Sequence, residues 1–225
     1  MTWANEIIVV DSGSTDDTVA ICREFTSHVY QHDWPGFGAQ KNRALNYASK
    51  KWVLSLDADE RVPHGLRMEI ESAMREEREE AYEMPRLSSF FGRYIRHSGW
   101  RPDYVMRLFK RGAGKFSDDL VHERVIISGN KGRLRQSILH ESFRDAEELL
   151  DKINHYSTAS ALMLRKKNRT ASLRTAVAHG LWAFLRSYLL RAGFLDGREG
   201  FMLAVSTAEG AYYRYVKLML MADKK

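Results

Sequence analysis

Apolar residues follow two different periods in the N-terminal part of the chain. Short runs rich in β-branched residues, at residues 7–10, 28–31 and 52–56, predict strands. Between them, a segment ending near residue 25 and another over residues 39–49 carry apolar side chains every three or four positions, which predicts helices. Strands that alternate with helices at short spacing predict an α/β fold with a mainly parallel sheet flanked by helices.

The pattern changes in the middle of the chain. A helix is expected from about residue 63 to residue 80, with apolar side chains on one face and many glutamates on the other. Residues 82–95 and 105–109 alternate small residues with Arg and aromatic residues, which predicts strands of antiparallel character. Residues 120–127 predict a further strand. The middle of the chain therefore adds a second kind of sheet to the first.

From about residue 146 onward the period is helical. Two later helical segments, residues 173–190 and 201–221, are separated by the glycine-rich sequence GFLDGREG. We therefore expect two domains, a sheet-containing core at residues 1–145 and a helical region at residues 146–225.

The composition is typical of a folded protein. Of the 225 residues, 44% are hydrophobic and 28% are charged, so the chain can bury a sizeable core. The single cysteine, Cys22, cannot form an internal disulfide and lies in a helical apolar pattern, which favours a reducing compartment. No apolar run has the roughly 18 residues of a membrane span, and residues 1–10 lack the features of a signal peptide. We expect a cytoplasmic protein without a spanning helix.

The net charge of +6 is concentrated near the C-terminus. Residues 161–225 contain 12 Lys and Arg against 4 Asp and Glu. Such a region can face nucleic acid, anionic lipid or a phosphorylated acceptor, and its aromatic and leucine content favours the last two. A solvated basic face without a partner explains the charge equally well. We expect an anionic membrane surface as a partner and no nucleic acid.

Two apolar runs end at carboxylates. EIIVVDSGSTDDT ends its run at Asp11, and WVLSLDADE ends in Asp57 and Asp59. Ligands bind at the rim formed by the carboxyl ends of parallel strands, so these side chains are candidate binding groups. Asp57 and Asp59 share one face of a strand, and their like charges favour a bound Mg²⁺ or Mn²⁺ that carries a diphosphate. The chemistry implied is transfer from a nucleotide-activated donor.

Other candidates for the nucleotide have two interpretations each. The carboxylate of Asp11 can cap the Ser-Gly-Ser turn that follows it, or it can accept the ring N–H of a uracil. Lys41, Asn42 and Arg43 can hold a nucleobase or phosphate, or they can form a basic surface cluster. A basic first turn opposes the helix dipole, which favours the binding role.

Transfer to a hydroxyl with inversion needs a base opposite the leaving group. The preferred candidate is Glu123 in LVHERV, with Asp118 and Asp119 as competitors. Trp100 is a candidate platform for a sugar face, and Arg107 can hold acceptor hydroxyls or phosphates. His140 can equally be a core histidine.

Together these motifs resemble the inverting glycosyltransferase family 2, whose members have a GT-A fold. The resemblance rests on EIIVVDSGSTDDT, GFGAQKNRAL, LSLDADERV, WRPDYVMRLFKR, the VHE that ends at Glu123, and GFLDGREGF. The middle and late segments resemble, more narrowly, the bacterial lipopolysaccharide-core β-1,4-glucosyltransferases.

The resemblance implies a role for each motif residue. Asp11 would bind uracil, and Lys41 would lie by the nucleotide. Asp57 and Asp59 would hold the metal and the diphosphate, and Glu123 would deprotonate the acceptor hydroxyl. The donor implied is UDP-glucose, and the acceptor is a membrane-embedded glycolipid approached from the cytoplasmic face. The same fold could instead serve polyprenyl phosphate, a protein or another glycan, or it could be an inactive nucleotide-binding remnant.

The start of the chain departs from the family pattern. Members usually open with a strand and helix of the SVVIxxxNE type that contribute to the nucleotide pocket, whereas this chain opens with MTWANEIIVVD, where the second strand is expected. Without the first strand, a row of interior backbone groups loses its partner, at about 1–3 kcal/mol for each buried group. We therefore expect the true start to lie upstream.

Overall fold

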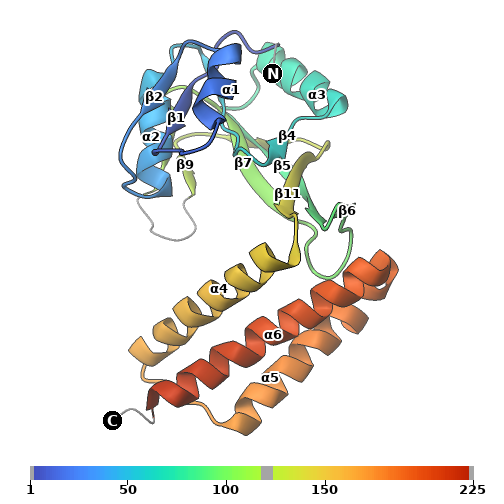
Figure 1. The fold of residues 1–225 in the computed structure, drawn as a ribbon. Coiled ribbons are helices and arrows are strands. Elements are labelled where there is room, and N and C mark those ends of the chain that lie inside the picture. Colours follow the sequence, from blue (N-terminus) through green and yellow to red (C-terminus); the bar gives the residue numbers. More distant parts are fainter. Residues whose placement is uncertain (1–2, 118–123, 223–225) are drawn as a thin grey trace. The chain divides into compact units, whose positions relative to one another are not determined.

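The computed structural model describes residues 3–117 and 124–222 (Figure 1). Contacts within the chain divide it into two units. The first unit consists of Met1–Ala58, Val62–Pro85 and Tyr104–Ser137, and the second of Asp59–Arg61, Arg86–Asp103 and Ile138–Lys225. Neither unit has a boundary between residues 145 and 146. The two domains expected from the sequence therefore stay a prediction.

The first unit begins with alternating strands and helices, as the sequence predicts. Strand β1 (Val9–Asp11) is followed by helix α1 (Thr18–Phe25) and by β2 (Val29–Gln31), which pairs with β1 in parallel. Helix α2 (Phe37–Tyr47) then leads into β3 (Trp52–Leu54). The β-branched runs form the strands because their side chains pack well on a pleated surface.

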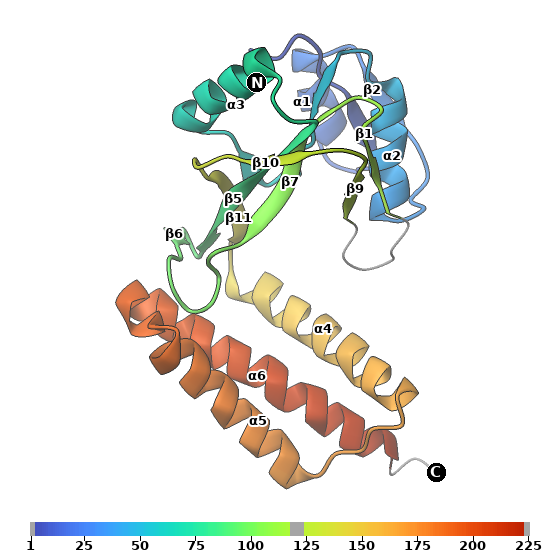
Figure 2. The same cartoon turned by 180° about the vertical axis from the view of Figure 1, so that it is seen from behind.

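A second sheet in this unit is mostly antiparallel. Strand β3 pairs with β7 (Tyr104–Lys110), and β7 pairs with Ala81–Pro85 of β5 (Ala81–Phe90), both in antiparallel fashion. Strand β10 (Lys131–Arg133) runs parallel to β5 on the other edge (Figure 2). Among the described strands, β1 pairs with β2 alone and β3 with β7 alone. The predicted antiparallel character of the middle strands is confirmed.

Helix α3 (His64–Glu76) buries Leu66, Ile70 and Ala73, the apolar face read from the sequence. The helix ends four residues earlier than predicted. Its last residue is followed by Glu77 in the left-handed region, with φ of 49°. A residue in this conformation ends the helical hydrogen-bond pattern, and a glutamate gives no sequence signal for it.

Strands β8 (Gly114–Phe116) and β9 (Val125–Ile127) form an antiparallel hairpin. Phe116 packs with Phe109 and Ala81 in the buried cluster of the first unit. The connection of this hairpin includes residues 118–123, which lie outside the described residues, so the predicted strand over residues 120–127 is seen only as β9.

The second unit contains the remaining described strands of the seven-stranded sheet to which β3, β7 and β5 belong. Arg86–Phe90 of β5 pairs in parallel with β11 (Ile138–Phe143), which pairs antiparallel with β4 (Glu60–Arg61). Strand β6 (Arg93–Tyr94) returns along β5 in a hairpin. The prediction of one continuous strand over residues 82–95 is therefore wrong. Phe91 and Gly92 form the turn with φ of 50° and 82°, the geometry of tight hairpins, and phenylalanine is unusual there.

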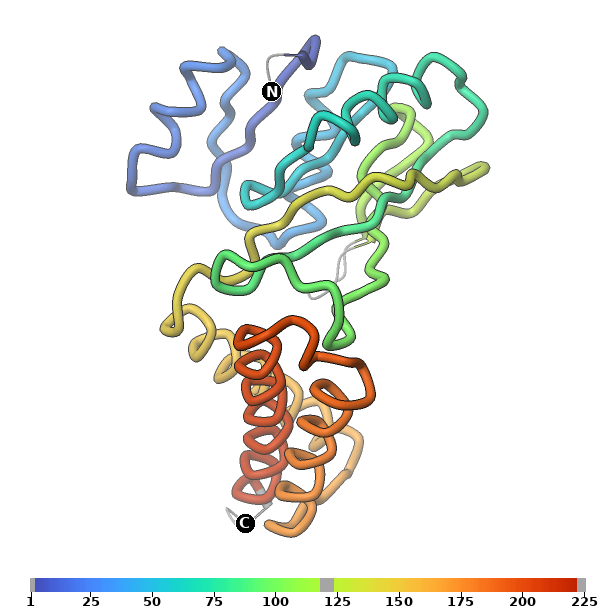
Figure 3. The backbone as a smooth tube through the Cα atoms, turned by 90° about the vertical axis from the view of Figure 1, so that its right-hand side faces the viewer, coloured from blue at the N-terminus to red at the C-terminus, as the bar shows by residue number. Residues whose placement is uncertain are grey.

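The rest of the second unit is helical, as predicted. Its elements are α4 (Ala146–Lys166), α5 (Leu173–Leu185), the π-helical turn η1 (Arg186–Leu190), the 3₁₀ turn η2 (Gly193–Asp196) and α6 (Gly197–Ala222). Helix α6 lies between α4 and α5 in Figures 1 and 2, and Figure 3 shows α5 beside α6 from a third direction. The α/β class and the helical C-terminal part are thus confirmed.

None of the helices in residues 3–117 and 124–222 combines the length and apolarity needed to span a membrane.

Candidate functional site

In the first unit, two cations contact the carboxylate that follows β3. Lys41 Nζ, from the first turns of α2, lies 2.7 Å from Oδ1 of Asp57. Nη2 of Arg107, from β7, forms an ion pair and a short hydrogen bond with Oδ2 of the same group. The side chain of Arg107 is only 8% exposed and that of Lys41 is 18% exposed. Asp57 is thus in contact with two other residues that the sequence analysis assigned to binding.

Charge governs the protonation of this cluster. Burial alone would raise the pKa of the Asp57 carboxyl, but the positive charges of Arg107 and Lys41 outweigh burial and hold the pKa below its ordinary value of 3.8. Asp57 is therefore ionised at neutral pH. Lys41 and Arg107 thus bring two cationic donors to one place, and such groups form charge-assisted hydrogen bonds with an anion such as a diphosphate.

Asp11 organises the turn after β1. Its Oδ2 accepts hydrogen bonds from the backbone N–H groups of Gly13, at 2.9 Å, and Ser14, at 3.1 Å. The Ser14 hydroxyl donates to Oδ1, and this bond is the main reason that the pKa of the Asp11 carboxyl lies below its ordinary value. These contacts are those of the turn-capping interpretation. Gln31 Nε2 also lies 3.5 Å from Oδ2, so four donors face the roughly four acceptor positions of this carboxylate, and uracil binding stays a prediction.

The first turns of α2 connect three parts of the first unit. Asn42 donates from Nδ2 to the carbonyl oxygen of Phe116 and accepts from the Phe116 N–H, both at 2.9 Å. This pair of bonds imitates a strand partner and holds the β8–β9 hairpin to α2. Gln40 Nε2 donates to Ser12 Oγ at 2.6 Å, and Arg43 pairs with Asp33 at 2.8 Å. Of the three basic-turn candidates, Asn42 and Arg43 therefore have structural partners.

Asp59 belongs to the second unit. Its Oδ2 lies 3.3 Å from Nε2 of His140 on β11, and its side chain is 38% exposed. The other ring nitrogen of His140, Nδ1, lies 3.0 Å from the Ser88 hydroxyl and 2.9 Å from the Ser142 hydroxyl. Because two hydroxyls can donate to Nδ1, Nε2 is the ring nitrogen that faces Asp59. These contacts fit the interpretation of His140 as a satisfied core histidine and also place its ring beside the acidic motif.

The remaining candidates have different outcomes. Trp100 is half-buried and packs against Phe90 and Phe143, with ring centroids 6.0 and 6.3 Å apart. This packing accounts for the position of the ring, and its use as a sugar platform stays a prediction. Glu123 and its competitors Asp118 and Asp119 lie outside the described residues, so the choice of base stays a prediction as well.

The donor set tests whether a metal ion fits. Asp57 contacts Lys41 and Arg107, whereas Oδ2 of the partly exposed Asp59 lies 3.3 Å from Nε2 of His140. Mg²⁺ needs only one or two protein carboxylates when diphosphate and water supply its other ligands. No group of three or more His, Cys, Asp or Glu that could hold a metal is found in the described part of the chain, and such an ion does not require one. Asp57 and Asp59 are of the residue type that fits a diphosphate-bound metal, and the choice of metal ligand stays a prediction.

Comparison with known proteins finds similarity to glycosyltransferases. The model of glycosyl transferase family 2 matches residues 4–172. The uncharacterized glycosyltransferase RP128 of Rickettsia prowazekii (strain Madrid E) is 29% identical over 226 residues, which cover 95% of this chain and 77% of that protein. The lipopolysaccharide core biosynthesis glycosyltransferase LpsC of Rhizobium meliloti (strain 1021) is 29% identical over 230 residues, covering 93% of this chain and 83% of LpsC.

Among solved structures, S. aureus TarS 1-349 in complex with UDP-GlcNAc aligns over 95% of this chain and 74% of that chain, with 14% identity and a TM-score of 0.46. A likeness of this size is too weak to support a conclusion about fold or ligand.

Proposed function

Because the chain belongs to glycosyltransferase family 2, with a match over residues 4–172, we propose that it is an inverting transferase that moves a sugar from a UDP-linked donor to a lipopolysaccharide-core acceptor. The proposed donor is UDP-glucose, and the proposed fold is the GT-A fold that the family resemblance implies. The observation that carries the proposal is the Asp57 cluster. It places two buried or half-buried cations on one carboxylate directly after a strand of an α/β unit.

The donor would be held mainly by charge. Lys41 and Arg107 can donate hydrogen bonds to diphosphate oxygens, and Arg107 offers the planar fork that suits phosphate. Asp57 fixes both cations, so their positions are set before the donor binds. Asp11 would accept the uracil N–H in place of the long contact from Gln31. The cluster thus supports binding of a nucleotide diphosphate, independent of which sugar it carries.

A divalent cation is proposed as the cofactor. Asp59 would hold Mg²⁺ or Mn²⁺, with Asp57 nearby in sequence contributing charge. When bound, such an ion would stabilise the negative charge that develops on the departing diphosphate. The chain's own contribution would be orientation, because Nε2 of His140 lies 3.3 Å from Asp59 and the ring is itself fixed by two hydroxyls.

The transfer step forms one bond and breaks one. The acceptor hydroxyl oxygen bonds to the anomeric carbon from the face opposite the diphosphate, and the bond between that carbon and the diphosphate oxygen breaks, so that UDP leaves with the electron pair. Glu123 would take the hydroxyl proton, with Asp118 and Asp119 as alternatives. The two hydrogen bonds between Asn42 and Phe116 fix the residue that lies two positions before Asp118 in the sequence.

The acceptor is proposed from the relatives and from the second unit. LpsC is named a lipopolysaccharide core biosynthesis enzyme, and such an acceptor is a glycolipid. The second unit exposes large apolar side chains on α5, η1 and η2 amid its excess of basic residues, which suits an anionic membrane surface. These side chains are Leu181, Trp182, Leu185, Leu189, Leu190, Phe194 and Leu195. We therefore propose a peripheral position at the cytoplasmic face of the membrane.

A transfer assay tests the proposal. The full chain would be incubated with Mn²⁺, a panel of UDP-sugars and purified lipopolysaccharide truncated before its first core glucose, and the product would be weighed by mass spectrometry. Addition of one hexose from UDP-glucose supports the proposal. Transfer to polyprenyl phosphate or another glycan, with the core acceptor left unmodified, would replace the acceptor. UDP binding without transfer to any acceptor would identify an inactive nucleotide-binding form.

A further inference from the structure

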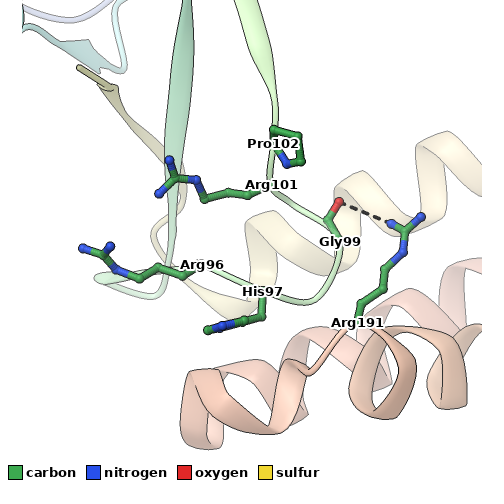
Figure 4. Close-up of a pocket in the computed structure, with 6 residues that line it drawn as sticks. All are labelled: Arg96, His97, Gly99, Arg101, Pro102 and Arg191. Atoms are coloured by element: carbon green, nitrogen blue, oxygen red, sulfur yellow. Dashed lines mark hydrogen bonds between the residues drawn. The ribbon is translucent and has the colours of Figure 1, made fainter. Parts of the chain in front are cut away.

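The second unit contains a pocket of about 460 Å³ that the proposed reaction does not use. It is lined by Arg96, His97, Gly99, Arg101, Pro102 and Arg191, and we call it the arginine pocket (Figure 4). Three of the six lining residues are arginines and none is acidic. A pocket with this lining has an excess positive charge and is suited to an anion.

The loop that forms one wall is fixed by a buried carboxylate. Asp196 of η2, only 3% exposed, accepts hydrogen bonds from the backbone N–H groups of Arg96, at 3.1 Å, and His97, at 2.9 Å. Its Oδ1 also lies 3.0 Å from Nδ1 of the His97 ring. Several donors on one buried carboxylate hold the loop in a single arrangement, so the pocket exists before a ligand enters it.

The second wall is joined to the loop by two further contacts. The N–H of Ser98 donates to the carbonyl oxygen of Arg191 at 2.9 Å. Figure 4 shows the Arg191 side chain reaching back to the carbonyl oxygen of Gly99, with 3.4 Å between Nη1 and O. Glycine suits position 99 because its φ is +86°, and a Cβ there would lie 2.0 Å from Arg191 Nη1 unless the arginine side chain moved. The Arg191 guanidinium thus occupies the space that a side chain at position 99 would take.

The other two arginines of the pocket, Arg96 and Arg101, form no ion pair with a described carboxylate. Within residues 3–117 and 124–222, no carboxylate pairs with the guanidinium of Arg96 or Arg101. In Figure 4 the side chains of Arg96, His97 and Arg101 extend from the loop toward the same side of the view. Guanidinium forks bind phosphate oxygens in pairs, which an ammonium group does not do.

The residues that flank Arg191 in the sequence indicate which kind of molecule would bear the phosphate. Leu189 and Leu190 precede it and Phe194 and Leu195 follow it, and all four are about half exposed or more, with Leu190 at 68%. Apolar side chains beside a phosphate-binding pocket match the boundary between lipid tails and headgroups. We propose that the arginine pocket binds a phosphate group, either of a lipid headgroup or of a soluble phosphate compound. This inference goes beyond sugar transfer and holds whichever donor the enzyme uses.

Two titrations test the proposal and separate the sources of phosphate. Calorimetry with inorganic pyrophosphate measures binding of a soluble phosphate. Flotation with phosphatidylcholine vesicles, alone or mixed with phosphatidylglycerol or with oleate at equal surface charge, measures lipid binding. Stronger binding to phosphatidylglycerol than to oleate identifies the headgroup phosphate, and binding of pyrophosphate without that preference identifies a soluble ligand. Absence of both overturns the proposal.

The variants use matched arginines of the same unit. Arg96→Gln combined with Arg101→Gln should weaken phosphate binding about tenfold, because charge-assisted hydrogen bonds are lost. Arg169→Gln combined with Arg174→Gln, two exposed positions outside the pocket, should change it by no more than about twofold. Equal losses in the two double variants, or no loss in the first, overturn the proposal.

A conservative pair guards against misfolding. Arg96→Lys with Arg101→Lys keeps the charge and loses the forks, so phosphate binding should fall while thermal unfolding stays close to wild type. UDP affinity, measured in parallel, should be the same in every variant. If the wild-type chain does not bind UDP, the proposed function is contradicted. The phosphate titrations still decide whether the arginine pocket binds phosphate.

Discussion

Nζ of Lys41 lies 2.7 Å from Oδ1 of Asp57, although the two residues belong to a helix and to the segment that follows a strand. Arg107 contacts the other oxygen of the same carboxylate from β7. One acidic side chain therefore joins three elements of the first unit. Removal of Asp57 should affect both the stability of this unit and its anion affinity.

Asp57→Asn should lower the free energy of unfolding by roughly 1–3 kcal/mol, because Arg107 is left buried without its charged acceptor. Urea unfolding at pH 7 measures the change. Asp33→Asn is the matched control, since Asp33 also pairs with an arginine but is 78% exposed, and it should cost no more than about 0.5 kcal/mol. Equal effects of the two variants would contradict a stabilising role for the Asp57 cluster.

The same carboxylate makes stability depend on pH. Its pKa in the folded chain lies below the ordinary value of 3.8, so its contribution is fully present above about pH 4 and is lost as pH falls through the folded pKa. The wild-type chain should lose more unfolding free energy between neutral pH and pH 3 than Asp57→Asn does. Identical pH profiles would show that Lys41 and Arg107 do not lower the pKa of this group.

Asn42→Ala should weaken the attachment of the β8–β9 hairpin, because both hydrogen bonds to the Phe116 backbone are lost. The expected cost in unfolding free energy is about 1–3 kcal/mol, since two backbone groups lose their partner. Asn46→Ala, at an exposed position of the same helix, is the control and should have little effect. If Glu123 is the base, Asn42→Ala should also lower kcat more than it changes the affinity for UDP.

Gly99→Ala tests the construction of the arginine pocket. Gly92→Ala is its matched control, because both glycines have positive φ, of 86° and 82°, but a Cβ at position 92 meets nothing within 4 Å. Each change should cost roughly 1–2 kcal/mol for the left-handed backbone. Only Gly99→Ala should in addition displace the Arg191 side chain and reduce pyrophosphate binding. Equal pyrophosphate affinity in the two variants would mean that Arg191 does not contribute.

The local parts of this fold could be predicted from the sequence. The runs that end at Asp11 and near Asp57 form strands, and the helix with Leu66 and Ile70 on one face lies where its period indicates. Such elements follow from the period of apolar residues alone. Strand β11 was not predicted, because polar His140 and Glu141 interrupt its apolar pattern. The turn at Phe91 was missed because its backbone conformation is unusual for that residue.

The candidate site could be predicted as a set of residues but not as a set of contacts. Asp57 and Arg107 are 50 positions apart in the sequence, and the pairing of their strands through β3 and β7 decides that they meet. The contact between His140 and Asp59 likewise depends on β4 pairing with β11. Pairing between distant strands depends on tertiary packing, which periodicity along one segment does not contain.

The most direct test of the central claim is calorimetric titration of the full chain with UDP-glucose, with and without Mn²⁺. We expect binding that Mn²⁺ strengthens, and we expect Asp59→Asn to lose that enhancement and all sugar transfer while unfolding at nearly the wild-type urea concentration, since the substitution keeps the side-chain volume. Asp151→Asn, an exposed position of α4, should leave both unchanged. Equal affinity for UDP-glucose with and without Mn²⁺, or full transfer by Asp59→Asn, would contradict the account.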